Sequence, residues 1–197
     1  AICIGRQFGS GGKEVALALG RKLGVEVYDS ELISKAAEES GFSKDLFAKS
    51  DERRGFFTAS NFFTYGRFSA GESYVQGNNI FQIQSEVIRD IAQKGSAIFI
   101  GRCSDYILRD MDTLSVFITA PMEDRIRRGA SRRGISESEA SSLIPKEDRT
   151  RETYYNYYTF GNWGMAGNYD LCIDSQLLGT EGTADMIIET AKRKGLI

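Results

Sequence analysis

Residues 2–16 read ICIGRQFGSGGKEVA, and this stretch decides the fold. An apolar run at 1–5 ends in a loop with glycines at positions 9, 11 and 12, and residues 14–23 then repeat apolar side chains at helical spacing. A strand, a glycine-rich loop and a helix in this order bring backbone N–H groups and the positive end of a helix to one point. The sequence therefore predicts a phosphate site in this loop, with Lys13 adding a point charge.

The loop departs from the common phosphate-loop pattern G-x-x-x-x-G-K-[ST] at two positions. Gly12 and Lys13 match, but Gln7 stands at the leading glycine and Glu14 stands where a hydroxyl would bind magnesium. Two alternatives remain open: an ordinary tight turn, and a dinucleotide fingerprint that begins at Gly9 and uses Asp29 as its ribose-binding acid.

Outward from the loop, short apolar runs alternate with helical patterns along the whole chain. Further strands are predicted at 25–28, 97–100, 113–119 and 169–173, and helices at 30–40, 43–49, 79–93, 122–133, 136–158 and 183–194. This alternation is typical of a parallel sheet covered on both faces, with ligands at the carboxyl ends of the strands. We expect one three-layer α/β domain over 1–197 with a five-stranded parallel sheet.

Composition excludes several classes of function. The 197 residues include no histidine, so Ser-His-Asp and Cys-His mechanisms are excluded, and 25 Lys+Arg against 27 Asp+Glu argue against general nucleic-acid binding. No apolar run is long enough for a membrane span and no signal peptide is visible, which leads us to expect a cytoplasmic protein. We also expect Cys3 and Cys172, both within apolar runs, to be buried core residues.

Polar residues follow the predicted strands where ligands would lie. Asp29 could orient an acceptor hydroxyl or hold magnesium through water, although a helix cap would explain it equally. Arg102 is expected to meet a substrate anion, with Asp105 either pairing with it or contacting substrate.

Seven of the arginines fall between positions 125 and 151, and Arg125, Arg128 and Arg132 share one helical face. A salt-bridged, solvated surface is the alternative reading of such a run. Together with the glycine loop, we favour a helical, Arg-rich lid over 122–158 that clamps phosphoryl charge.

Two aromatic segments have no assigned chemistry. The Phe- and Gly-rich insert at 51–78 is either packing or a subunit contact, or else it covers the acceptor. A homo-oligomer could form through 56–68 or through 154–160, where the tyrosine run is mostly expected to pack and less readily to stack on a base.

The chain resembles the cytidylate kinase-like family, a branch of the P-loop nucleoside monophosphate kinases. Six pieces carry the resemblance: ICIGRQFGSGGKEVA, VYDSELI, FIGRCSDYIL, SVFITAPMEDRIRR, EDRTRETYYNYYT and NYDLCIDSQLLG. It implies a P-loop kinase fold, ATP as donor, magnesium and an Arg-bearing lid.

Carried onto this sequence, the resemblance assigns residues to each role. The ATP phosphates would be held by Gly9, Ser10, Gly11, Gly12, Lys13, Glu14 and Val15. Arg125 would lie near adenine, Arg102 would contact the small-molecule acceptor, a nucleotide, and Arg149 and Arg151 would be lid arginines. Together with Lys13 and Asp29, these two arginines are the expected catalytic residues.

The sequence also departs from cytidylate kinases. Val15 replaces a threonine, and no Tyr-Arg pair follows Asp29. The family's Gly-Arg-Asp triplet reads Gly-Arg-Cys at 101–103, and the next acid is Asp105. The expected function is transfer of the ATP γ-phosphoryl group to a nucleoside monophosphate or similar small acceptor. A kinase of a small hydroxylated metabolite, using Asp29 as shikimate kinases do, and a non-catalytic nucleotide sensor remain alternatives.

Overall fold

The computed structural model describes residues 1–39 and 74–197. Its five strands are β1 (Ile2–Arg6), β2 (Glu26–Tyr28), β3 (Ala97–Ile100), β4 (Leu114–Thr119) and β5 (Leu171–Asp174). They form one parallel sheet in the order β2-β3-β1-β4-β5, which confirms the predicted fold class.

Helices connect and cover these strands. They are α1 (Gly12–Leu23), α2 (Ser30–Glu39), α5 (Tyr74–Lys94), α6 (Ser104–Ile107), α7 (Met122–Arg133), α8 (Glu137–Thr159) and α9 (Ser175–Arg193), with a short 3-10 turn at Ala166–Asn168. The expected helix at 43–49 and most of the 51–78 insert lie outside the described residues, while 74–78 begin α5.

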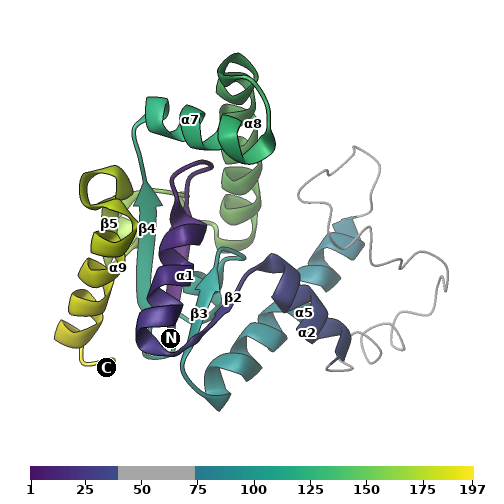
Figure 1. The fold of residues 1–197 in the computed structure, drawn as a ribbon. Coiled ribbons are helices and arrows are strands. Elements are labelled where there is room, and N and C mark those ends of the chain that lie inside the picture. The colour runs from purple at the N-terminus through teal and green to yellow at the C-terminus, as the bar shows by residue number, and fades with distance from the viewer. Residues whose placement is uncertain (40–73) are drawn as a thin grey trace.

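Successive side chains along each strand point to opposite faces of the sheet, and a hydrophobic core lies on each face. Ile2, Ile4 and Val116 pack against α1 and α9 on one face. Cys3 and Phe99 point to the other face, where α2, α5, α6 and α8 cover them. Figure 1 shows the three resulting layers, with α1 and α9 on one side of the sheet and α2 and α5 on the other.

The prediction for Cys172 is wrong, because its side chain is exposed whereas Cys3 is buried. Leu171 and Ile173 turn toward the face packed by α1 and α9, so Cys172 turns to the opposite face. β5 is the edge strand, and the helices on that opposite face leave Cys172 uncovered.

The last helix is longer than expected, because it starts at Ser175 rather than 183. Asp174 caps it by accepting from the N–H of Gln176 at 2.8 Å, and Gly179 (φ 65°, ψ 179°) kinks it. The kink interrupts the helical period over its first turns, which hides that part of the helix from a pattern search. None of the helices within 1–39 and 74–197 is long and apolar enough to cross a membrane.

α7 and the start of α8 stand beyond the carboxyl ends of the strands, and the rest of α8 runs back along the sheet (Figure 1). Gly134 (φ 64°) ends α7, and a capping box between Ser136 and Glu139 starts α8, so the turn between the helices is specified locally. The predicted helices at 122–133 and 136–158 are confirmed.

Candidate active site

The glycine loop between β1 and α1 lies beneath α7 (Figure 1). Gly9 (φ 76°) and Gly11 (φ 78°) occupy the left-handed region that side chains disfavour. A Cβ on Gly9 would also meet the carbonyl oxygen of Arg125 at 2.5 Å. Glycine at position 9 is therefore required both by the turn and by the close approach of α7.

The N-terminus of α1 offers donors without acceptors in the helix. Gly11 is its N-cap and supplies no side-chain bond, and the first intrahelical bond runs from the N–H of Val15 to the carbonyl of Gly11. The N–H groups of Gly12, Lys13 and Glu14 thus lack intrahelical partners. Such a helix end at a glycine loop fits a phosphate group.

Lys13 and Asp29 meet beside this helix end. The Lys13 ammonium lies 2.7 Å from Oδ2 of Asp29, while Oδ1 accepts from the backbone N–H groups of Glu31 and Leu32 at 3.0 and 3.2 Å. Asp29 therefore caps α2 and faces the glycine loop at once. Partial burial alone would raise its pKa, but the bond from Lys13 and the backbone N–H groups together lower the pKa below 3.8.

A metal at this site would have few protein ligands. No group of three candidate ligand side chains exists within the described part of the chain. Magnesium usually needs only one or two carboxylates together with substrate phosphates, and Asp29 is the acid placed beside Lys13. Glu14, where the common motif has a hydroxyl, is instead paired with Arg132 at 3.3 Å.

Three arginines of α7 reach down to the loop and α1. Arg125 is 4% exposed, and its Nε donates to the carbonyl of Phe8 at 2.8 Å. Arg128 contacts the carbonyl of Gly9 at 3.4 Å, and Arg132 pairs with Glu14. The predicted shared face of these arginines is confirmed, and it is the face turned toward the glycine loop.

The predicted contact between Arg125 and adenine stays a prediction. In this structure its guanidinium is held by the carboxylate of Asp148, which also accepts from the N–H of Phe8 at 2.7 Å. Arg125 and Asp148 together tie α7, α8 and the glycine loop into one buried network.

The two predicted lid arginines of α8 differ in their surroundings. Arg151 donates to the carbonyl of Arg6 at 3.2 Å, and its guanidinium carbon lies 5.5 Å from the ring centroid of Phe8. Arg149 is 77% exposed and pairs with Glu152 on its own helix. Only Arg151 lies at the loop here, so a phosphate contact by Arg149 requires it to leave Glu152.

Arg102 and Asp105 follow β3 but are directed differently. Arg102 (φ 58°) places its guanidinium carbon 5.8 Å from the ring centroid of Tyr154. Asp105 accepts a 2.7 Å bond from the hydroxyl of Tyr155. Its carboxyl lines a separate pocket that includes no residue of the glycine loop, so its predicted acceptor contact stays a prediction.

Sequence reasoning gave no role to three residues that shape the loop. In the sequence Asp148 is one of several acids among the arginines of 122–158, yet in the structure it bridges the lid and the loop. Ser175 donates its hydroxyl to the carbonyl of Ser10 at 2.5 Å, which ties α9 to the loop. Arg6 lies under the turn after β3, where a Cβ on Gly101 would come within 2.1 Å of its Nη1.

The chain shares its sequence pattern with a known protein family. A family model described as "Cytidylate kinase-like family" matches residues 1–177. The chain belongs to the cytidylate kinase-like family. The resemblance drawn from the six sequence pieces is therefore confirmed.

Among curated relatives, cytidylate kinase of Sulfolobus acidocaldarius is 31% identical over 116 residues, covering 58% of this chain and 63% of that protein. Uronate isomerase of Corynebacterium glutamicum is 31% identical over 157 residues, covering 78% of this chain and 30% of that protein. The chain thus spans about a third to two thirds of the length of these relatives.

Solved structures extend the likeness to the whole fold. An uncharacterized protein from Eubacterium ventriosum matches with a TM-score of 0.72 and 27% identity, over 97% of both chains. Shikimate kinase from Bacteroides thetaiotaomicron matches with a TM-score of 0.53 over 97% of both chains, and its 14% identity indicates a shared fold alone. The three-layer P-loop kinase fold is thereby established.

Proposed function

We propose that this protein transfers the γ-phosphoryl group of ATP to a small acceptor, with a nucleoside monophosphate as the first candidate. The observation that carries the proposal is the contact between Lys13 and Asp29 at the end of a glycine loop, beside three N–H groups of α1 that lack partners within the helix. Membership of the family and the match to a cytidylate kinase support it.

Each part of the site has a role in this reaction. The loop from Gly9 to Val15 would hold the ATP phosphates, chiefly through the N–H groups of Gly12, Lys13 and Glu14, and Lys13 would neutralise charge on the group that is transferred. Magnesium would supply further charge neutralisation, and Asp29 would be the carboxylate that holds it through water.

Asp29 would also orient the acceptor. Its Oδ2 lies beside Lys13, so an acceptor oxygen bound to this carboxylate would lie near the phosphate held by the ammonium. Positioning of this kind contributes more to phosphoryl transfer than covalent chemistry does. Arg102 would bind the acceptor from the neighbouring strand.

The lid would exclude water and stabilise the transferring charge. Arg151 already lies at the loop, and Arg149 would join it when the lid rearranges around bound nucleotide. Arg125 would keep α7 against the loop through Phe8 and Asp148, so that adenine binds beside a fixed helix.

A kinase of a small hydroxylated metabolite is the second candidate. The sequence Asp29-Ser30-Glu31 has a second acid two positions after the one paired with Lys13, which would suit an acceptor hydroxyl. The relative named uronate isomerase gives a reason to include sugar acids among the acceptors tested.

The experiment is a turnover panel with ATP and magnesium. Production of ADP would be followed with nucleoside monophosphates, shikimate and hexuronates as separate acceptors, for the unmodified protein and for Lys13→Ala. Turnover with a nucleoside monophosphate that Lys13→Ala abolishes supports the proposal. ATP binding without transfer to any acceptor would favour a nucleotide sensor.

A further inference from the structure

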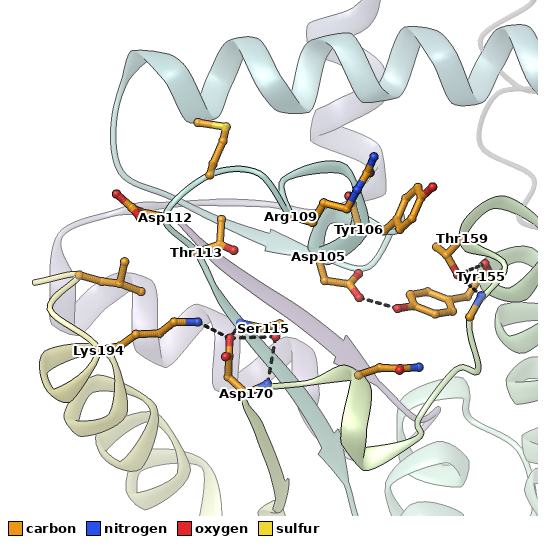
Figure 2. Close-up of a pocket in the computed structure, with 14 residues that line it drawn as sticks. Asp105, Tyr106, Arg109, Asp112, Thr113, Ser115, Tyr155, Thr159, Asp170 and Lys194 are labelled. Carbon is orange, nitrogen blue, oxygen red and sulfur yellow. Dashed lines mark hydrogen bonds and ion pairs between the residues drawn. The ribbon is translucent and has the colours of Figure 1, made fainter.

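A pocket of about 480 Å³ lies on the sheet face that carries α6 and α8 (Figure 2). It is lined by α6 and the segment before β4, by the end of α8, and by residues next to β5 and after α9. Its volume is that of a site for a small molecule. None of its lining residues belongs to the glycine loop, to α7 or to the pair of Lys13 and Asp29.

Two carboxylates face this pocket from different elements. Asp105 of α6 accepts from the hydroxyl of Tyr155, and Asp170, just before β5, lies on the opposite side (Figure 2). Oδ2 of Asp170 accepts from the N–H and hydroxyl of Ser115 and from Lys194, at 2.7 to 2.9 Å. Because all three of these bonds end on Oδ2, Oδ1 of Asp170 keeps its capacity to accept from a ligand.

The Asp105 carboxylate has the capacity to accept a further hydrogen bond from a ligand. Burial raises its pKa, and the hydroxyl of Tyr155 and backbone N–H groups offset only part of that effect. A ligand hydroxyl that donates to this carboxylate would stabilise its charged form.

Two cations line the same pocket. Arg109 donates to the carbonyl of Tyr106 at 2.8 Å, and its guanidinium carbon lies 4.2 Å from the centroid of the Tyr106 ring. Its Nε also lies 4.0 Å from Oδ2 of Asp110, and the side chain stays 48% exposed, so its remaining N–H groups can reach a ligand. The Lys194 ammonium donates to Asp170 and keeps further N–H donors.

The charges indicate the class of ligand. Three aspartates and two cations line the pocket, so a doubly charged phosphate would meet more negative than positive groups. Hydroxyl groups, in contrast, both donate to carboxylates and accept from guanidinium and ammonium.

We propose that this pocket binds a sugar-sized polyhydroxylated molecule, neutral or with a single carboxylate, through Asp105, Asp170 and Arg109. The site is independent of the proposed phosphoryl transfer. Ligand binding here and ATP binding at the glycine loop therefore have separate tests.

The test is a fluorescence titration of the whole protein. Trp163 is the only tryptophan, and it lies in the sequence between the lining residues Gly161 and Asn168. Neutral hexoses, hexuronates and hexose phosphates would be titrated, with and without saturating ATP. We expect a saturable change with a hexose or hexuronate, weaker binding of the phosphates, and no competition by ATP.

Variants decide whether binding occurs in this pocket. Arg109→Ala and Asp105→Asn each remove one charged contact and should weaken binding about tenfold, while Lys13→Ala should leave it unchanged. Arg21→Ala is the matched control, because that exposed arginine pairs with Glu181 away from the pocket.

Three outcomes would overturn the proposal. They are no saturable binding at millimolar sugar, equal affinity in Arg109→Ala and the unmodified protein, and loss of binding in Lys13→Ala. Arg109→Ala is decisive if Asp105→Asn fails to fold, because the half-exposed Arg109 makes only local contacts.

Discussion

Substitution of Lys13 by alanine tests the phosphate site without requiring turnover. In the structure the Lys13 ammonium contacts Asp29 at 2.7 Å, and the Lys13 side chain is 45% exposed. A partly exposed ion pair contributes at most about 1 kcal/mol to stability, so the variant should fold. A charged bond to phosphate contributes roughly 1.5–3 kcal/mol, which corresponds to a loss in ATP affinity of about 10- to 150-fold.

Calorimetric titration with ATP and magnesium measures this loss directly. Lys22→Ala is the matched control, because Lys22 lies on the same helix but pairs with Glu181 and Asp185. Its ATP affinity should equal that of the unmodified protein. Unchanged ATP affinity in Lys13→Ala, or an equal loss in Lys22→Ala, would refute the assignment of the glycine loop as the phosphate site.

Three further predictions concern stability and access. Because the folded-state pKa of Asp29 is lowered, its charge stabilises the fold above about pH 4, and this contribution is lost as pH falls through the folded pKa. The difference in unfolding free energy between the unmodified protein and Asp29→Asn, measured by urea unfolding at several pH values, should therefore shrink in acid. Asp148→Ala removes the carboxylate that pairs with the buried Arg125 and should lower the unfolding free energy by about 3–5 kcal/mol. Glu147→Ala, whose partner Arg133 is half-exposed, should lower it by less than about 1 kcal/mol, and equal losses would contradict the buried network. Of the three cysteines, Cys172 alone should react with a thiol reagent in the folded protein, since burial raises the pKa of Cys3 to about 12, and mass spectrometry of labelled peptides identifies the site.

The fold followed from local patterns in the sequence. All five strands were expected within two residues of their observed bounds, because each is a short apolar run bounded by turn residues. The start of α9 was not predicted, because Gly179 kinks the helix and interrupts the helical spacing of apolar residues there. The exposure of Cys172 was not predicted either, because an apolar run in the sequence does not show which strand lies at the edge of the sheet.

The contacts in the candidate site between residues far apart in the chain could not be predicted from the sequence. The glycine loop, Lys13 and Asp29 were recognisable because each directly follows a strand, and parallel strands bring their carboxyl ends together. Asp148 is 140 residues from Phe8, and nothing in the sequence distinguishes it from the neighbouring acids of a charged helix. Its role depends on how α8 lies over the loop, which is set by packing of the whole chain.

The central claim is that the site at Lys13 and Asp29 transfers phosphate. Incubation with γ-³²P-labelled ATP, magnesium and single acceptors, followed by separation of the products, tests it most directly. The account predicts a labelled acceptor, with a nucleoside monophosphate as the best substrate, and no labelled product from Lys13→Ala. Equal labelling by Lys13→Ala, or ATP binding without a labelled product from any acceptor, would contradict it.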